Sequence, residues 1–582
     1  MVARLLRSLR WIPAIPLALA LAACTDGTTP DVIAFDVPAL TLGPSLTGSL
    51  SVRNAGPRAV GPIELRSGPV SAGGATDVPG AHLVVDPPEL STLPAGASAV
   101  LQVRIESGTL LQAGTYATEL VAAIPGAETR LPVSFTMPAV TGVEAAAVQI
   151  TSGPTTVRQG DVTPYRAEAR DTAGAPLQGA AITWSVTPQD AGFVAPSGAL
   201  VAYQPGTLTL RAHVGGLTAR LDVTVSARGL GGDAVRVGEG AVLERHTSDL
   251  WLHGSYAYTG TWGARTRNGV SLWGDALNVW DLSTPTSPVR VDAVSIEART
   301  LNDVKVRSDG ALAVITHEGD NAGRNGVTFL DLADPAHPAV LSRFTQGLES
   351  GVHNAWLDGD YAYLVVDGVG NGLRILDIRD PRAPRLAASF YGGSSFLHDV
   401  YVRDGLAFLS HWNAGLIILD VGNGVAGGSP TNPVEVSRVP DLGGQTHNAW
   451  YWPESGYVFV GEEDFQSPGH MHVVDLHDLS NPVEVASFRV PGTTPHNFWL
   501  DEERGVLYLA WYERGLHALD VSGPLLGDLR AQGREVFGVE YDGQGFGCAT
   551  VDGTCTWAPQ LHGGLLYVSD MNNGLVVLRP TF

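Results

Sequence analysis

The sequence predicts an all-β protein, and three observations carry this prediction. Glycine occurs 70 times and proline 38 times in a chain that is 44% hydrophobic and only 16% charged, which indicates many turns between short buried strands. Apolar and polar residues alternate between residues 31 and 227, as they do in half-buried strands. Beyond that region a short apolar motif recurs about every 50 residues, a period typical of repeat folds.

Residues 1–23 have the pattern of an export signal, with three arginines before a short apolar run. The end of this run, Leu-Ala-Ala-Cys, resembles the bacterial lipobox, which implies that Cys24 carries a lipid such as palmitate and becomes the mature N-terminus. The alternative is an ordinary signal peptide in which Cys24 is incidental. Residues 24–30 are then a tether. Because Thr25 is not acidic, the resemblance favours the outer membrane of the cell envelope, on its periplasmic or its cell-surface side.

Residues 31–139 and 141–227 are predicted to form two β-sandwiches, because each shows short alternating segments separated by turn residues. The segment around Trp184, Ile-Thr-Trp-Ser, resembles a strand of bacterial immunoglobulin-like domains, which implies that this tryptophan fills the core. Neither sandwich carries a convincing catalytic group of residues. We therefore expect both to act as spacers between the membrane and the C-terminal part.

Residues 232–582 contain an apolar pentamer that ends in aspartate in six of its seven copies. The copies are Leu277–Asp281, Val327–Asp331, Leu373–Asp377, Leu416–Asp420, Met471–Asp475, Leu516–Asp520 and the divergent Leu575–Arg579. Each unit has room for four short antiparallel strands, so a seven-bladed β-propeller is predicted, with six blades as the nearest alternative. The final unit lacks a fourth strand, and we expect residues 234–242 to supply it and to close the ring. The aspartates are expected to cap turns.

These pentamers resemble those of the LVIVD-repeat family. The resemblance implies a propeller of the kind predicted for bacterial and archaeal surface proteins. It does not imply an activity, because the family is known by its shape more than by its chemistry.

Polar pairs at the start of the first strand of most units form the candidate site. They are Asn302 and Asp303, His353 and Asn354, His398 and Asp399, His447 and Asn448, and His496 and Asn497. If the first strand is innermost, these pairs ring one mouth of a central channel. The ends of the second strands reach the same face, so His317, His411 and Glu462 are expected to join the four histidines as metal ligands.

Three interpretations of this polar ring are open. Imidazoles and carboxylates are ligands of transition metals, and a bound metal could activate water or oxygen. Alternatively, the repeated side chains bind the backbone of the next blade and fix the ring geometry, as their recurrence from blade to blade suggests. A metal-free acid–base site is the third interpretation. Ca²⁺ held by acidic loops is a separate candidate cofactor.

Other chemistry is largely excluded. The chain has no Gly-x-Ser-x-Gly elbow, no phosphate loop and no His-Glu-x-x-His motif, and Lys305 is its only lysine. A net charge of −23 argues against a nucleic-acid partner. Cys548 and Cys555 are expected to form a local disulfide in an oxidising compartment, since no further ligands for zinc lie near them.

The sequence therefore supports three functions. The first is a lipid-anchored protein of the cell surface whose propeller binds a protein or polysaccharide. The second is a metal-dependent hydrolase or oxidase, which needs at least three of the six histidines to converge on one point. The third is a purely structural envelope protein. Aromatic or charged side chains exposed on a loop face would favour the binding function.

Overall fold

The computed structural model describes residues 33–582 except 44–45, 73–77, 79–80, 108–110, 112, 126, 138–144, 321, 441, 466–468, 542–547 and 549–552. The predicted signal peptide, Cys24 and the tether lie outside these residues. The described chain is built from strands, and its one helical element is the short 3₁₀ turn η1 (Gln189–Ala191). None of its helices is long and apolar enough to cross a membrane. The all-β prediction is confirmed.

The described residues from 33 to 137 form one compact unit. Its first sheet contains, in spatial order, β1 (Ile33–Phe35), β3 (Thr47–Asn54), β8 (Ser98–Ser107) and β6 (Ala81–Asp86). Its second sheet contains β2 (Leu40–Leu42), β10 (Ala127–Met137), β9 (Gly114–Ile124), β4 (Ile63–Ser67) and β7 (Glu89–Leu90), with β5 (Ser71–Ala72) beside β9. One hydrophobic core joins the two sheets, and Tyr116 stacks on Phe135 within it.

The second unit begins with three small sheets that share two neighbouring cores. They are β11 (Ala147–Ser152) with β14 (Arg166–Arg170); β12 (Thr156–Arg158), β19 (Leu217–Ser226), β18 (Gly206–Val214) and β15 (Thr183–Thr187); and β13 (Val162–Pro164), β17 (Ala199–Ala202) and β16 (Gly192–Val194). Trp184 is half-buried and packs against both cores, whereas Tyr165 is the largest fully buried side chain here. The immunoglobulin-like class of this region stays a prediction.

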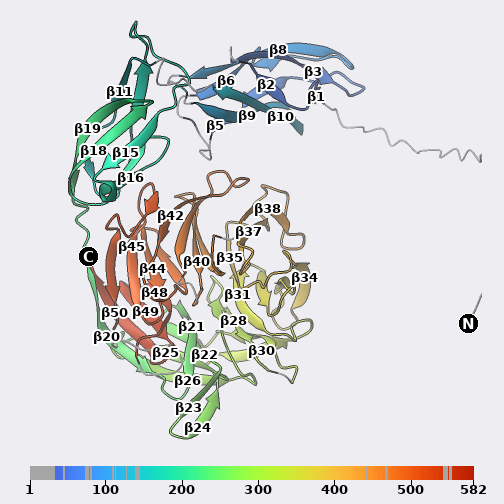
Figure 1. Cartoon of the computed structure of the whole chain (residues 1–582). Helices are drawn as coiled ribbons and strands as arrows, with labels where there is room; N and C mark the ends of the chain where they lie inside the picture. The colour runs from blue at the N-terminus through green and yellow to red at the C-terminus, as the bar shows by residue number, and fades with distance from the viewer. Residues whose placement is uncertain are drawn as a thin grey trace, which may run out of the picture. The chain divides into compact units, whose positions relative to one another are not determined.

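The C-terminal region forms seven successive antiparallel sheets, which we number as blades 1 to 7. Blade 1 contains β21 (His246–His253), β22 (Tyr256–Trp262), β25 (Ala276–Asp281) and β26 (Val289–Ser295). Blade 2 contains β27 (Val304–Val306), β28 (Leu312–His317), β29 (Gly326–Asp331) and β30 (Ala339–Phe344). Blade 3 contains β31 (Val352–Asp358), β32 (Tyr361–Val366), β33 (Leu373–Asp377) and β34 (Arg385–Phe390). A hairpin of β23 (Ala264–Arg267) and β24 (Val270–Trp273) extends from blade 1 (Figure 1).

The other four blades repeat this order. They are β35 (Asp399–Arg403), β36 (Leu406–Ser410), β37 (Leu416–Asp420) and β38 (Val434–Val439); β39 (Thr446–Trp452), β40 (Tyr457–Glu462), β41 (Met471–Asp475) and β42 (Val483–Phe488), with β46 (Gly527–Asp528) added; β43 (Phe498–Asp501), β44 (Val506–Ala510), β45 (Leu516–Asp520) and β47 (Glu535–Val539); and β48 (Thr556–His562), β49 (Leu565–Asp570), β50 (Gly574–Thr581) and β20 (Asp233–Ala241). The first strand of each blade contacts the first strand of the next, and β48 contacts β21.

The ring is closed by the strand that precedes blade 1 in the chain. β20 pairs antiparallel with β50, from Asp233 opposite Thr581 to Ala241 opposite Gly574. This confirms the prediction that the segment starting at Ala234 supplies the missing fourth strand. Because the two ends of the ring are joined through backbone hydrogen bonds, no sheet edge is left at the junction.

Two buried arginines connect the ring to the segment that precedes it. Arg228 donates to Asp520 Oδ2 from Nε at 2.9 Å and from Nη2 at 2.6 Å, and its Nη1 donates to Asp161 at 2.9 Å. Arg534 reaches the backbone oxygen of Gly160 at 2.7 Å. Because Arg228 and Arg534 are almost completely buried, these charge-assisted bonds hold the second sandwich against blade 6.

The pentamer aspartates cap turns, as predicted. In six blades the Oδ1 atom accepts the backbone N–H two residues further on, from Asp281 with Ser283 to Asp520 with Ser522. Asp420 has an exceptional set of contacts, since it also accepts the N–H groups of Gly424, Ala426 and Gly428. These backbone donors hold its pKa well below the ordinary value, although burial acts in the opposite direction.

We expect Asp420→Asn to lower the free energy of unfolding by about 2 kcal/mol, because the amide keeps one acceptor oxygen where four N–H groups converge. The matched control is Asp331→Asn. Asp331 lies at the same repeat position, is partly exposed and caps Ala333. Its replacement should therefore lower the free energy of unfolding by less than about 1 kcal/mol. Chemical denaturation of both variants measures the difference, and equal losses would show that the extra bonds of Asp420 do not stabilise the ring.

Candidate functional site

The first strand of each blade delivers side chains to the ring axis in three layers. The polar pairs predicted from the sequence lie at the start of this strand. We call the first members of the pairs the mouth layer and the second members the polar layer. The residue two positions further along belongs to the inner layer, because alternate residues of a strand point to the same side.

The mouth layer is a closed ring of aromatic side chains. Ring centroids lie 4.3 Å apart between His353 and His398, 4.3 Å between His398 and His447, and 4.4 Å between His447 and His496. Trp557 follows at 4.2 Å from His496, and Trp262 closes the circle at 5.4 Å from Trp557 and 6.0 Å from His353. Trp262 comes from the second strand of blade 1, so it fills the space left by the smaller Ser248 and Asn302.

Side chains of the mouth layer and the polar layer bind the backbone of the following blade. Asn302 Nδ2 donates to the oxygen of His353 at 2.7 Å, and Asn448 Nδ2 donates to the oxygen of His496 at 3.0 Å. His398 Nδ1 lies 3.1 Å from the oxygen of His447, and His496 Nδ1 lies 2.7 Å from that of Trp557. These contacts are the ones that the structural interpretation of the polar pairs requires.

Lys305 occupies the axis between two aspartates. Its Nζ lies 2.7 Å from Asp249 Oδ2 and within hydrogen-bond range of Asp303 Oδ1, and all three residues are buried. Asp303 Oδ2 also accepts the N–H of Ala355 at 2.8 Å, and Asn497 Nδ2 donates to Asp249 Oδ1 at 3.0 Å. The one ammonium compensates one of these two buried carboxylates, and burial together with Asp249 raises the pKa of Asp303 well above its ordinary value, against the opposing effect of Lys305.

The inner layer closes the axis a second time. Trp356, Tyr401, Trp450 and Trp499 follow one another at centroid distances of 4.7, 5.1 and 5.2 Å. Trp251 contacts Trp356 at 5.7 Å and Trp499 at 6.4 Å. Between the polar and inner layers, lined by residues such as Asn354 and Asp399, lies a cavity of about 50 Å³, which has room for one or two water molecules. The axis is thus packed and is not an open channel.

The ends of the second strands place part of the predicted metal set away from the mouth layer. His317, His411 and Glu462 occupy one position of this strand, and the residues immediately after them occupy the next. Since neighbouring residues of a strand point to opposite sides, only the following residues reach the mouth layer. His317 Nε2 lies 2.8 Å from Thr328 Oγ1 instead, and Glu462 Oε2 lies 3.0 Å from His472 Nε2.

His411 has no hydrogen-bond partner for either ring nitrogen among the described residues. Burial lowers its pKa to about 4, so it is a neutral side chain packed inside the sheet. None of these three residues contacts the four mouth histidines, and the six histidines therefore do not form one ligand set.

The residues that do reach the mouth layer are Glu318, Asp367, Trp412, Glu463 and Tyr512. The predicted ligand set does not include the carboxylates Glu318, Asp367 and Glu463, although the alternation of the strand would have identified them. Two groups of side chains lie close together. One contains His353, Glu318 and Asp367, and the other contains His398, His447 and Glu463. Within each group the candidate ligand atoms lie within 4.8 Å of one another. Neither group is made of carboxylates alone, as a Ca²⁺ site would favour.

The first group is an ion pair. His353 Nδ1 lies 3.0 Å from Glu318 Oε2 and 4.0 Å from Asp367 Oδ1. Burial lowers the pKa of His353, but the two carboxylates outweigh it and raise the pKa to about 9. Burial and the neighbouring Glu318 raise the pKa of Asp367 to about 8. His353 is therefore protonated at neutral pH.

The second group is held in its neutral imidazole form. Burial and the neighbouring histidines lower the pKa values of His398 and His447 well below the ordinary value. Burial raises the pKa of Glu463 to about 7, against the opposing effect of a hydrogen bond from Tyr512. Trp412 stacks on His398 at 4.7 Å. Trp412 and Tyr512 both have positive φ values, 29° and 43°, which is costly for aromatic residues and is common at functional sites.

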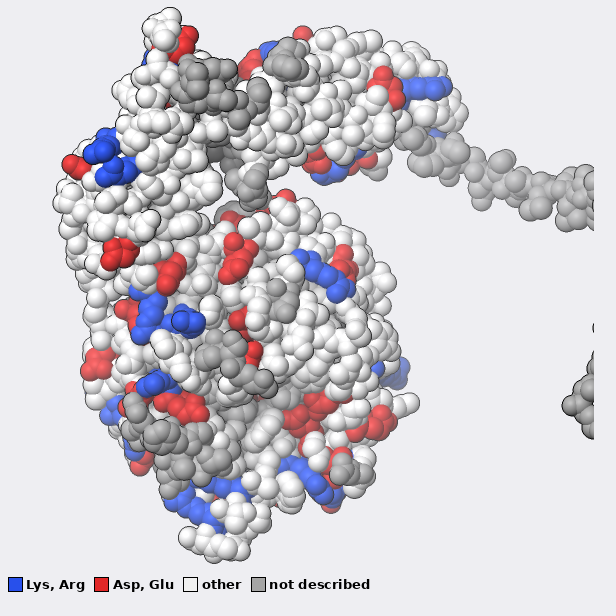
Figure 2. Space-filling model, in the orientation of Figure 1, with Lys and Arg blue, Asp and Glu red and all other residues white. Residues whose placement is uncertain are grey.

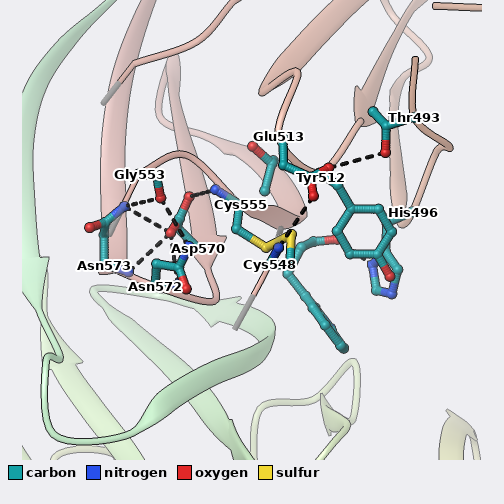
Figure 3. Close-up of a disulfide and its surroundings, with 12 residues drawn as sticks. Thr493, His496, Tyr512, Glu513, Cys548, Gly553, Cys555, Asp570, Asn572 and Asn573 are labelled. Atoms are coloured by element: carbon teal, nitrogen blue, oxygen red, sulfur yellow. Dashed lines mark hydrogen bonds between the residues drawn. A yellow bond between two sulfur atoms is a disulfide. The ribbon is translucent and has the colours of Figure 1, made fainter. Parts of the chain in front are cut away.

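The predicted disulfide lies beside this site. Cys548 and Cys555 are bonded, with 5.4 Å between their Cα atoms. Figure 3 shows the disulfide between Asp570, which accepts the N–H of Cys555 at 2.7 Å, and the segment of Tyr512 and Glu513. Glu513 accepts the N–H of Cys548 at 3.2 Å. The disulfide thus lies between β47 of blade 6 and β48 of blade 7, and the backbone of its cysteines bonds Glu513 of blade 6 and Asp570 of blade 7.

Comparison with protein families identifies the repeat. LVIVD repeats match residues 244–265, 351–391, 397–441 and 560–578. The chain therefore contains LVIVD repeats at four places, in blades 1, 3, 4 and 7, and these repeats fit a β-propeller. No curated protein matches the chain.

Replacement of Lys305 tests the charge balance at the axis. Lys305→Met leaves Asp249 and Asp303 buried without a cation, and we expect a loss of about 3–5 kcal/mol in the free energy of unfolding. Adding Asp249→Asn and Asp303→Asn removes the uncompensated charges and should recover most of that loss. Chemical denaturation measures both variants, and a loss below about 1 kcal/mol for the single variant would contradict the interpretation.

The contact between His472 and Glu462 predicts a pH dependence. Burial lowers the pKa of His472, but Glu462 and Glu484 raise it to about 9, from an ordinary value near 6.5. Because the folded state binds this proton more tightly, the stabilisation is complete below about pH 6.5 and is lost as the pH rises through about 9. Between these two pH values, we expect the free energy of unfolding of the unmutated chain to fall by about 2 kcal/mol more than that of the His472→Gln variant. The exposed His477→Gln is the control, and it should retain the full pH dependence in denaturation curves.

Proposed function

We propose that the chain is a lipid-anchored protein of the cell envelope that binds a protein partner through the mouth face of its propeller. The mouth face consists of the loops between the second and third strands of each blade and those between successive blades. The observation that carries this proposal is a set of exposed aromatic side chains on separate loops of this face.

Three aromatic residues stand out on the mouth face. Trp273 in hairpin β23–β24 is 46% exposed, Tyr391 after β34 is 55% exposed, and Phe465 after β40 is 63% exposed. Arg299 lies 4.6 Å from the ring centroid of Trp273, and Arg374 lies 5.0 Å from that of Tyr391. Aromatic and arginine side chains are enriched where proteins bind proteins.

The rest of the surface explains why these residues matter. On the face drawn in Figure 2, acidic and basic side chains lie in small separate groups among uncharged residues. No extended basic patch is seen among the described residues of this face, in agreement with the net charge of −23, which disfavours binding of a phosphate backbone. The packed axis leaves room for water only, so a small-molecule ligand of the axial cavity is not supported.

A protein partner is favoured over a polysaccharide by the spacing of the aromatic residues along the repeat. Trp273, Tyr391 and Phe465 belong to blades 1, 3 and 5, and each is exposed in a separate loop. A sugar chain is usually held by neighbouring rings that form one platform, whereas separated aromatic anchors suit a partner with a broad surface. The proposed lipid anchor at Cys24 holds the chain at the membrane.

Photo-crosslinking in cells tests this proposal. A photo-reactive phenylalanine analogue replaces Tyr391 or Phe465 in the full chain, and in the control chains it replaces Val340 or Leu386. These two control residues are similarly exposed but begin fourth strands at the opposite face. We expect discrete adducts from the mouth positions alone, and we expect protease to destroy the attached partner.

The outcomes separate the alternatives. An adduct that survives protease and is removed by glycosidases would replace the protein partner with a polysaccharide. Equal labelling from the mouth and control positions, or no adduct from either mouth position, would contradict a binding role for this face. If the three aromatic residues bind one partner, adding Trp273→Ala to the chain that carries the photo-reactive analogue at position 391 or 465 should reduce the yield of adduct at least threefold.

A further inference from the structure

Three polar atoms of the mouth layer face one another without bonding. His447 Nε2 lies 3.7 Å from Glu463 Oε2, and His398 Nε2 lies 3.9 Å from the same oxygen. All three ligand atoms lie within 4.8 Å of one another. These separations are too long for hydrogen bonds. The two nitrogen–oxygen separations are a few tenths of an ångström longer than the roughly 3.4 Å between ligands of a tetrahedral ion with bonds of ~2.1 Å.

Neighbouring groups orient these atoms toward a shared point. His398 Nδ1 lies 3.1 Å from the backbone oxygen of His447 and donates to it, which leaves Nε2 available as a ligand atom. Tyr512 donates its hydroxyl to Glu463 Oε1, which leaves Oε2 available. Hydrogen bonds to the second atom of a ligand orient metal ligands in proteins. His398 and Glu463 have such a bond, whereas His447 Nδ1 is buried without a partner among the described residues.

The neighbouring cluster provides an internal comparison. There, His353 Nδ1 lies 3.0 Å from Glu318 Oε2, within hydrogen-bond range. In the cluster of His398, His447 and Glu463 the nitrogen–oxygen separations of 3.9 and 3.7 Å are too long for such a bond. The two clusters are adjacent, yet only the second leaves a space of this size between its nitrogen and oxygen atoms.

We propose that His398, His447 and Glu463 form a binding site for a divalent first-row transition metal at the mouth of the propeller. Two imidazoles and one carboxylate suit Zn²⁺ or Fe²⁺ and leave a further position for water or an exogenous ligand. The stacked rings of Trp412 and His398 limit access to this position. The site does not depend on the proposed docking function, since it lies within one chain and needs no partner.

The test uses the untagged full chain, purified in mild detergent and freed of metal with a chelator. Competition with a chromophoric chelator measures the affinity for Zn²⁺, and Co²⁺ serves as a spectroscopic probe of the ligand geometry. We expect one equivalent of Zn²⁺ and a visible Co²⁺ spectrum of a four-coordinate site. His398→Gln, His447→Gln and Glu463→Gln should each weaken Zn²⁺ binding at least 100-fold.

Matched variants distinguish this site from its surroundings. Glu462→Gln changes the adjacent carboxylate that faces His472, and His496→Gln changes another histidine of the same ring; both should keep the affinity within about threefold. If a ligand variant fails to fold, Tyr512→Phe takes its place and should weaken binding about tenfold, because it releases Glu463 Oε1. Absence of Zn²⁺ binding by the unmutated chain would overturn the proposal. The proposal would also be overturned if His353→Gln or Glu462→Gln weakened Zn²⁺ binding while His398→Gln, His447→Gln and Glu463→Gln did not.

Discussion

The pairing of β20 with β50 is the interaction on which the rest of the propeller depends. Because the strand before blade 1 completes blade 7, the two ends of the repeat are tied together through the backbone. The innermost strands must then surround one axis, and the space along that axis has to be filled from all sides. Two layers of aromatic rings and one buried lysine with its two aspartates fill it.

Structural and chemical roles coexist in the same histidines. His398 and His496 use Nδ1 to bind the backbone of the next blade, which stabilises the ring. Their Nε2 atoms are not needed for that contact and point into the mouth layer. The recurrence of histidine from blade to blade is thus explained by packing and backbone contacts. Glu463 faces His398 and His447 without a hydrogen bond, whereas the carboxylate at the same position of blade 2, Glu318, is bonded to His353.

The candidate site could be predicted in part from the sequence. The histidine and asparagine pairs were found because they stand at a fixed place in the repeat, and Lys305 occupies a repeat position that holds an aromatic residue in blade 1 and in blades 3 to 6. His317, His411 and Glu462 were chosen because their side chains resemble metal ligands. They face the sheet interior, and Glu463 faces the mouth, because the direction of a side chain alternates along a strand. A one-residue difference in register therefore decided which carboxylate belongs to the site.

The sequence by itself determined the all-β class, the repeat, the turn-capping aspartates and the disulfide between Cys548 and Cys555. Each of these follows from local spacing, since strands, turns and short loops depend on residues close together in the chain. Only the tertiary structure decided that the axis is packed, that Trp262 completes the mouth layer and that His398 and His447 meet Glu463. These contacts join different blades, and their distances depend on how closely the blades approach around the axis, which no local pattern specifies.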